Sequence, residues 1–129
     1  MRLSVRIGLL ALTLAVGGSV AQKPAIKRTI LQRQDTSVPG HEVIIARVEI
    51  PPGGSAGPHT HPGEEISYIL DGEAEILVND KAPSKVKAGD SFVIPAGARH
   101  DARNTGSEPF RLVAVYYVEK GKPLATPAP

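Results

Sequence analysis

The 129-residue sequence contains no cysteine. A chain without cysteine has no disulfide framework, no thiol nucleophile, no thiolate zinc site and no cysteine for a lipid anchor. Tryptophan is also absent, and Tyr and Phe together supply only five residues. Downstream of residue 21, 13 basic residues balance 13 acidic ones. A charge-neutral chain with so few stacking rings is not expected to bind nucleic acid.

Helical periodicity is missing as well. After residue 22 the apolar residues form short alternating runs between turn residues, and no 3.6-residue repeat is apparent. These runs predict eight strands: Ile26–Gln32, Val43–Ile50, Glu65–Leu70, Ala74–Val78, Lys85–Lys87, Ser91–Ile94, Arg99–Arg103 and Phe110–Val118. Pairs such as Asp71-Gly72 between the runs suit hairpin turns, because they tolerate positive φ. The pattern predicts one all-β domain, a sandwich or a barrel.

Only the N-terminus carries a long apolar run. Arg2 and Arg6 precede ten apolar residues at positions 7–16, and the small residues Ser19 and Ala21 follow. This order is typical of a cleaved signal peptide, here residues 1–21. Ten residues form a helix of only ~15 Å, about half the thickness of the hydrocarbon core, so a transmembrane anchor is disfavoured. We therefore expect a periplasmic or secreted protein without a stable membrane anchor.

Three of the four histidines lie in one patterned region. His59 and His61 occupy alternate positions of a predicted strand, so both side chains point to the same face. Glu65 opens the next strand after a turn, and His100 follows a second turn at residues 95–97. Three neutral imidazoles and one carboxylate suit a divalent transition metal. Without an ion, four convergent polar groups would be costly inside a barrel.

The spacing around these residues resembles the two signature motifs of the cupin superfamily. The first motif is matched by Gly53, His59, His61, Glu65 and Gly72. The second is matched by Gly89, Pro95, Gly97, His100 and Asn104. Sixteen residues separate Gly72 from Gly89, close to the short spacing of compact single-domain members. The resemblance implies a single jelly-roll cupin β-barrel, which we assign to residues 22–119, followed by a flexible tail at 120–129.

The resemblance also implies a metal centre near the mouth of the barrel. The family's ligand positions correspond to His59, His61, Glu65 and His100, and the cofactor is one divalent transition metal: Mn, Fe, Cu, Ni or Zn. Two functions stay open. One is a dioxygenase-like enzyme acting on a small molecule, with Glu65 as the catalytic, proton-handling ligand. The other is a non-catalytic extracytoplasmic module that binds a small ligand or the metal.

Strand alternation assigns several further side chains. Ser67 and Ile69 share the face of Glu65 and are expected to line its pocket. The opposite face of the same strand carries Ile66, Tyr68 and Leu70, and we expect another sheet or a second subunit to cover this apolar stripe. Many members of the family that the sequence resembles dimerise in this way, so the resemblance implies a homodimer. Two further residues are placed by position: Asn104 is expected to shape the barrel, and His41, alone before a strand, to be exposed.

Overall fold

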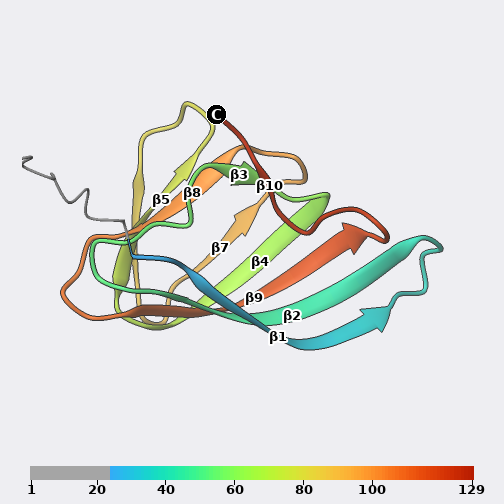
Figure 1. Ribbon diagram of the computed structural model, residues 1–129, viewed down its shortest axis with the longest axis horizontal. Helices are drawn as coiled ribbons and strands as arrows, with labels where there is room; N and C mark the ends of the chain where they lie inside the picture. The colour runs from blue at the N-terminus through green and yellow to red at the C-terminus, as the bar shows by residue number, and fades with distance from the viewer. Residues whose placement is uncertain (1–23) are drawn as a thin grey trace, which may run out of the picture.

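The computed structural model describes residues 24–129, and these form two five-stranded antiparallel sheets without any helix (Figure 1). The expected signal peptide lies outside the described residues. The first sheet has the order β1-β2-β9-β4-β7 and the second the order β10-β3-β8-β5-β6. Within residues 24–129, no helix suited to crossing a membrane is found. The predicted all-β jelly roll is confirmed.

All eight predicted strands are present, with ends that differ by a few residues. The strands are β1 (Lys27–Asp35), β2 (His41–Ile50), β3 (His59–Thr60), β4 (Gly63–Asp71), β5 (Glu73–Val78), β6 (Ser84–Lys87), β7 (Ser91–Ile94), β8 (His100–Asn104), β9 (Phe110–Glu119) and β10 (Thr126–Pro127). Two strands lie outside those eight runs, β3 and β10, and each has only two residues. The alternation of His59 and His61 indicated a strand there, of which the structure forms only His59–Thr60, whereas nothing in the sequence pattern indicated β10.

The core is built mainly by the inward faces of β2 and β9. These two strands pair along their whole length, from His41 opposite Glu119 to Ile50 opposite Phe110. Every second side chain of β9 is buried, and the same holds for the second half of β2. Aromatic, β-branched and small side chains alternate there, which gives an apolar interior on the first sheet. The second sheet contributes little to this core, so its inner face is free for polar groups.

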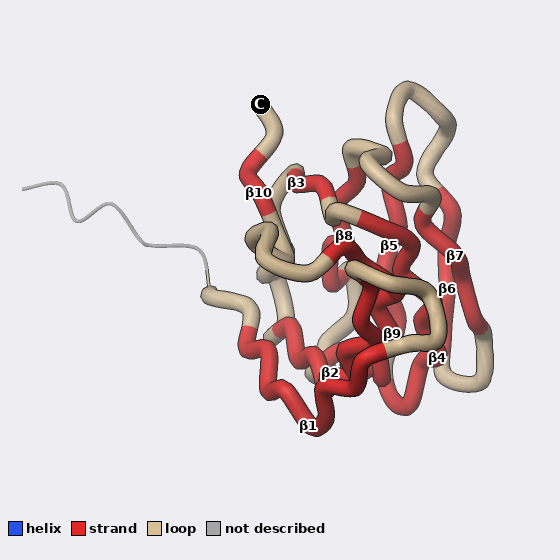
Figure 2. The backbone as a smooth tube through the Cα atoms, turned by 90° about the vertical axis from the view of Figure 1, so that its right-hand side faces the viewer, coloured by secondary structure: helices blue, strands red, loops and turns tan. Residues whose placement is uncertain are grey.

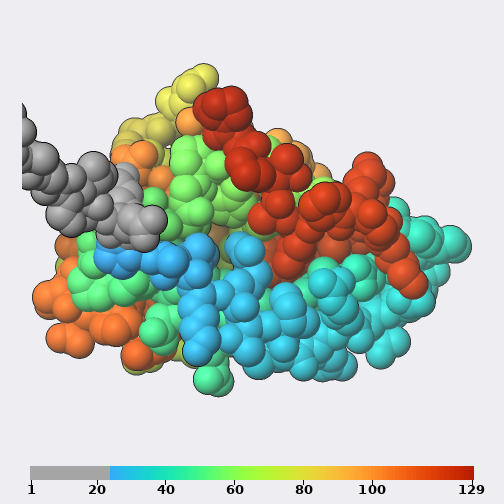
Figure 3. Space-filling model, viewed as in Figure 1, coloured from blue at the N-terminus to red at the C-terminus, as the bar shows by residue number. Residues whose placement is uncertain are grey.

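The tail at residues 120–129 differs from the flexible segment that we expected. Its strand β10 pairs with β3, with Thr126 opposite Thr60 and Pro127 opposite His59. Arg99 Nε donates to the carbonyl of Pro129 at 3.0 Å. Figure 3 shows the C-terminal segment lying against the body of the protein, and in Figure 2 β3 and β10 lie on the side of the barrel opposite β1 and β2. Proline-rich sequence has no apolar period, and long-range pairing holds this segment in place.

Gly63, the first residue of β4, tests how closely the first sheet is packed. A Cβ atom at this position would lie 1.8 Å from the Tyr117 carbonyl oxygen of β9. Because main chain rather than a movable side chain blocks it, we predict that Gly63→Ala lowers the free energy of unfolding by roughly 3 kcal/mol. Urea unfolding followed by circular dichroism measures this loss.

Gly97→Ala is the matched control. Gly97 has a φ of +70° but no atom within 4 Å of an added Cβ, so only the backbone conformation is penalised, by about 1–2 kcal/mol. An equal or smaller loss for Gly63→Ala than for Gly97→Ala would contradict the close approach of β4 and β9.

Candidate metal centre

The four residues singled out by spacing meet at one point inside the barrel. One ligand atom from each of His59, His61, Glu65 and His100 lies within 4.8 Å of the others, and all four residues are buried. Glu65 comes from β4 of the first sheet, whereas His59 and His100 face each other across β3 and β8 of the second. The group therefore spans the two sheets, which places it between the layers.

Main-chain carbonyls hold all three imidazole rings in the same way. Nδ1 of His59 donates to the carbonyl of Gly57 at 2.6 Å, and Nδ1 of His100 donates to the carbonyl of Ala98 at 2.9 Å. Nδ1 of His61 donates to the carbonyl of Leu124, which lies 63 residues further along the chain. A carbonyl oxygen only accepts, so Nδ1 carries the proton in each ring and Nε2 is left with its lone pair.

The three Nε2 atoms point into the same small space. His59 Nε2 and His61 Nε2 lie 3.2 Å apart, and Glu65 Oε2 lies 3.0 Å from His61 Nε2 and 3.4 Å from His100 Nε2. Lone pairs at these distances repel each other unless a cation or a proton lies between them. Metal-binding histidines usually donate their other ring N–H to a main-chain carbonyl or a carboxylate in this way. The donor set of three nitrogens and one carboxylate therefore fits a divalent transition metal.

Glu65 is kept ionised by its neighbours. Burial raises the pKa of this carboxyl group, but contacts with His100, His61 and Ser67 outweigh burial and hold the pKa well below its usual range. Ser67 Oγ donates to Glu65 Oε1 at 2.7 Å, which leaves Oε2 directed at the imidazoles. The carboxylate is thus charged and oriented at neutral pH, as metal ligation requires.

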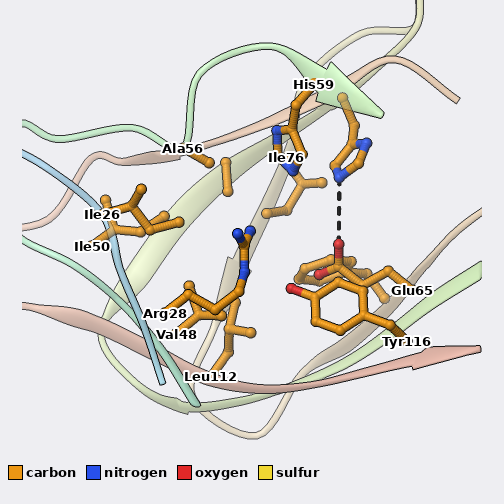
Figure 4. Close-up of a pocket in the computed structure, with 13 residues that line it drawn as sticks. Ile26, Arg28, Val48, Ile50, Ala56, His59, Glu65, Ile76, Leu112 and Tyr116 are labelled. Atoms are coloured by element: carbon orange, nitrogen blue, oxygen red, sulfur yellow. Dashed lines mark ion pairs between the residues drawn. The ribbon is translucent and has the colours of Figure 1, made fainter. Parts of the chain in front are cut away.

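A narrow pocket adjoins the cluster on the inner side of β1, β2 and β9. His59, Glu65 and His100 form its polar end. Its remaining walls come from Ile26, Arg28, Val48, Ile50, Ala56, Ile76, Phe92, Ala102, Leu112 and Tyr116. In Figure 4 the Tyr116 hydroxyl and the Arg28 guanidinium both point into this space. Burial, together with the charge of Glu65, raises the pKa of Tyr116 to about 12, so its hydroxyl is a neutral donor at pH 7.

The predictions made for four further residues near the cluster are confirmed in part. Ser67 and Ile69 are buried on the face of Glu65, but neither lines the pocket: the first orients Glu65 and the second packs in the core. Asn104 shapes the barrel as expected, since its Nδ2 donates to the carbonyls of Ile50 and Glu108 at 2.8 Å each. His41 is half-buried, contrary to expectation, because its ring stacks on Tyr117.

Three residues at the site escaped the sequence analysis. Tyr116 lies directly opposite Glu65 in the β4–β9 pairing and shares its face with Leu112, so strand alternation alone could have placed it. No comparable signal existed for Arg28, which precedes an irregularity between Ile30 and Gln32 in the edge strand β1. Leu124 acts through its main-chain carbonyl, which any residue provides, so its side chain gave no indication.

Comparisons with known proteins agree with this geometry. The family model described as Cupin domain matches residues 46–116. An oxalate-binding protein from Thermotoga maritima is 42% identical over 73 residues, covering 56% of this chain and 60% of the relative. The germin-like protein subfamily 2 member 2 of Arabidopsis thaliana is 35% identical over 79 residues, covering 57% of this chain and 36% of the relative. The chain thus spans about a third to three-fifths of these two relatives.

Two solved structures show the same fold. A conserved Klebsiella pneumoniae protein with a double-stranded β-helix domain superposes with a TM-score of 0.65 at 25% identity, covering 81% of this chain and 85% of that one. The DMSP lyase DddQ from Ruegeria pomeroyi superposes with a TM-score of 0.60 at 29% identity, covering 67% of this chain and 43% of the lyase. The likeness extends well beyond the residues matched by the family model.

The histidine cluster makes the metal-free protein sensitive to acid. Burial lowers the pKa of His59 from 6.5 to about 4, despite the opposing hydrogen bond to Gly57. Between these pH values the unfolded chain takes up a proton that the folded one does not, so folding stability falls as the pH falls. We predict a loss of no more than about 3 kcal/mol from this residue, with a further loss below pH 4.5 as Glu65 protonates in the unfolded chain.

Urea unfolding of the metal-free protein across this pH range measures the effect. His59→Gln should flatten the dependence between pH 6.5 and 4, whereas His41→Gln, outside the cluster, should leave it unchanged. A native protein whose unfolding midpoint does not move between these pH values would show that His59 is not buried in neutral form.

Proposed function

The chain belongs to the cupin domain family, and on that premise we propose that it is an exported protein that binds one divalent transition metal ion and uses it on a small molecule. The observation that carries this proposal is the arrangement of the three imidazoles. Their Nδ1 protons are all taken by main-chain carbonyls, and their Nε2 lone pairs converge on the Glu65 carboxylate. A core held together by apolar packing alone would not require three imidazoles and a carboxylate to be oriented toward one point.

The identity of the ion is narrowed by the ligand set. Nitrogen and carboxylate ligands without sulfur suit Mn, Fe, Cu, Ni or Zn, with affinity rising from manganese to copper. Such an ion supplies a Lewis-acid or redox centre to a bound molecule. If the chain is exported unfolded, it binds its metal only after export. The concentrations of the different metal ions in the outer compartment would then decide which ion is bound.

We propose a dioxygenase-type reaction, with Glu65 as the residue that handles the proton. Glu65 is the carboxylate of the cluster, and Ser67 holds one of its oxygens while the other faces His61 and His100. The pocket beside it is walled mainly by apolar side chains, which exclude water from the reacting groups. The Tyr116 hydroxyl adds a neutral donor at the same place.

A binding module without catalysis is the second candidate. It is favoured by the name of the Thermotoga maritima relative, an oxalate-binding protein. In that case the four ligands serve only to hold the ion, and the ion or the pocket holds the ligand. The two candidates predict the same metal content, so turnover separates them.

The location that we propose is the periplasm or the exterior of the cell. It rests on the sequence of residues 1–21, where two arginines, a ten-residue apolar run and small residues precede Gln22. Intact-mass measurement of native protein would give a chain that begins at Gln22 if this proposal holds.

Metal binding is tested by elemental analysis of purified protein. We predict close to one divalent ion per chain, and a lower content together with a lower melting temperature in His59→Ala and His100→Ala, because metal binding stabilises the folded state. His41→Ala, which removes a histidine outside the cluster, should retain the ion. An unchanged metal content in the double variant His59→Ala, His61→Ala would contradict the assigned ligands.

Turnover is tested on protein loaded separately with manganese, iron, copper or nickel. Oxygen consumption and product formation are followed with phenolic and small keto-acid substrates. Activity that disappears in Glu65→Gln while the metal is retained supports the enzyme with Glu65 in the proton-handling role. If no metal gives turnover but small ligands still bind, the binding module is the function.

A homodimer is the assembly that we propose. The outer face of β4 exposes Ile66, Tyr68 and Leu70, with exposed fractions of 45%, 53% and 40%, and Val93 beside Ile66 is 59% exposed. No part of residues 24–129 covers this face. A second copy would remove this patch from water. Light scattering should give twice the monomer mass, and Tyr68→Lys should shift the mass toward the monomer; a monomer at micromolar concentration in the native protein would argue against the dimer.

A further inference from the structure

Arg28 places a positive charge inside the pocket next to the metal ligands. It lies on the inner face of β1, opposite Val48 of β2. Its Nε atom is buried, and among the described residues it has no hydrogen-bond partner. No ion pair joins its guanidinium to a carboxylate within residues 24–129, and the first acidic residue of the whole sequence is Asp35. Among the residues that the structure describes, no carboxylate therefore neutralises the charge of Arg28.

The charges that line the pocket do not cancel once a metal is bound. Glu65 is the only carboxylate among the pocket residues, and it belongs to the ligand set. A divalent ion, one carboxylate and one guanidinium leave an excess of two positive charges between mostly apolar walls. Uncompensated charge in such surroundings is costly, so the site attracts an anion.

The donors are placed so that one anion can use two of them. Figure 4 shows the guanidinium of Arg28 and the hydroxyl of Tyr116 directed into the same space, with His59 and Glu65 at the other end. The guanidinium carbon lies 5.8 Å from the centre of the Tyr116 ring, and this cation–π contact keeps the two side chains together. A planar guanidinium matches the two oxygens of a carboxylate.

We propose that the ligand of this pocket is a small organic carboxylate, bound by Arg28 and Tyr116 at its carboxylate and directed at the metal by its other end. This inference rests on the proposed function, because the metal provides the second point of attachment. Phosphates and sulfates fit less well, since their tetrahedral oxygens need donors on several sides, and most of the pocket wall is apolar, including Ile26 and Leu112.

The size of the pocket limits the length of the ligand. Its free space is about 20 Å³, roughly room for one water molecule. A ligand of a few carbon atoms therefore requires the long side chain of Arg28, which is half-buried on the edge strand β1, to shift toward solvent. Ligands with aromatic rings would require the core side chains of β2 and β9 to move as well.

Titration of Zn²⁺-loaded protein, followed by NMR chemical shifts, tests the proposal. The probes are acetate, pyruvate and oxalate, with acetamide and methyl pyruvate as neutral counterparts of the first two. We expect the carboxylates to bind at least tenfold more tightly than their neutral counterparts. Arg28→Met should weaken carboxylate binding tenfold or more, because a charge-assisted, two-pronged hydrogen bond is lost. Tyr116→Phe should weaken it severalfold.

Two further variants separate a local role of Arg28 from general effects. Arg47→Met removes an exposed arginine from the outer face of β2 and should leave carboxylate binding unchanged. Arg28→Lys keeps the positive charge, so this variant should bind carboxylates more tightly than Arg28→Met does. If the two variants bind carboxylates equally weakly, the charge of Arg28 does not have the proposed role. Elemental analysis accompanies each sample, so a loss of zinc marks a failure of the metal site itself. Equal carboxylate affinity in native protein and Arg28→Met, with zinc retained, would overturn the inference.

Discussion

Four buried ligand atoms with lone pairs directed at one another impose the main constraint on this protein. The Nε2 atoms of three histidines and one oxygen of Glu65 lie within 4.8 Å of each other. Without a cation or proton between them this group destabilises the fold, and with one it joins the two sheets. Much of the surrounding structure serves to hold these atoms in a position that apolar packing alone would not favour.

The two sheets contribute different parts of the cluster and its surroundings. The first sheet provides the apolar core along β2 and β9 and contributes Glu65 and Tyr116 from neighbouring strands. The second provides the histidines, from β3 and β8 and the chain that follows β3. Loop carbonyls at Gly57 and Ala98 fix two rings locally, two residues before each histidine. Folding of the core therefore brings the carboxylate to His59 and His100, whose rings are held by short-range contacts, and to His61, whose partner is distant in the chain.

Strand alternation accounts for what could be predicted from the sequence. It placed His59, His61 and Glu65 on inward faces and the Ile66–Leu70 stripe on the outer one, because side chains of a strand alternate strictly. It gave no information where that rule does not apply. Arg28 lies in a strand with an irregular register, and the order of residues 120–129 comes from pairing with β3, more than 60 positions earlier.

His41 shows a different limit of the same reasoning. Its position ahead of an apolar run indicated an exposed side chain, yet its ring stacks on Tyr117 of β9 at a centroid distance of 5.3 Å. The partner is supplied by the β2–β9 pairing, in which Val43 faces Tyr117. The residues next to His41 in the sequence do not reveal which residue of the neighbouring strand it will contact. The burial of a residue at the end of a strand therefore depends on how the strands pair.

The hydrogen bond from His61 to Leu124 has a consequence for the order in which the site is assembled. Leu124 follows all four ligand residues in the chain, so during synthesis, or during passage of an unfolded chain through a pore, it emerges after the ligands do. Until then the His61 ring lacks the carbonyl that holds its proton on Nδ1, and β3 lacks its partner strand β10. A nascent chain therefore presents all four ligand residues before the His61 ring is held, and the cluster takes its final geometry only when the carboxyl-terminal segment docks.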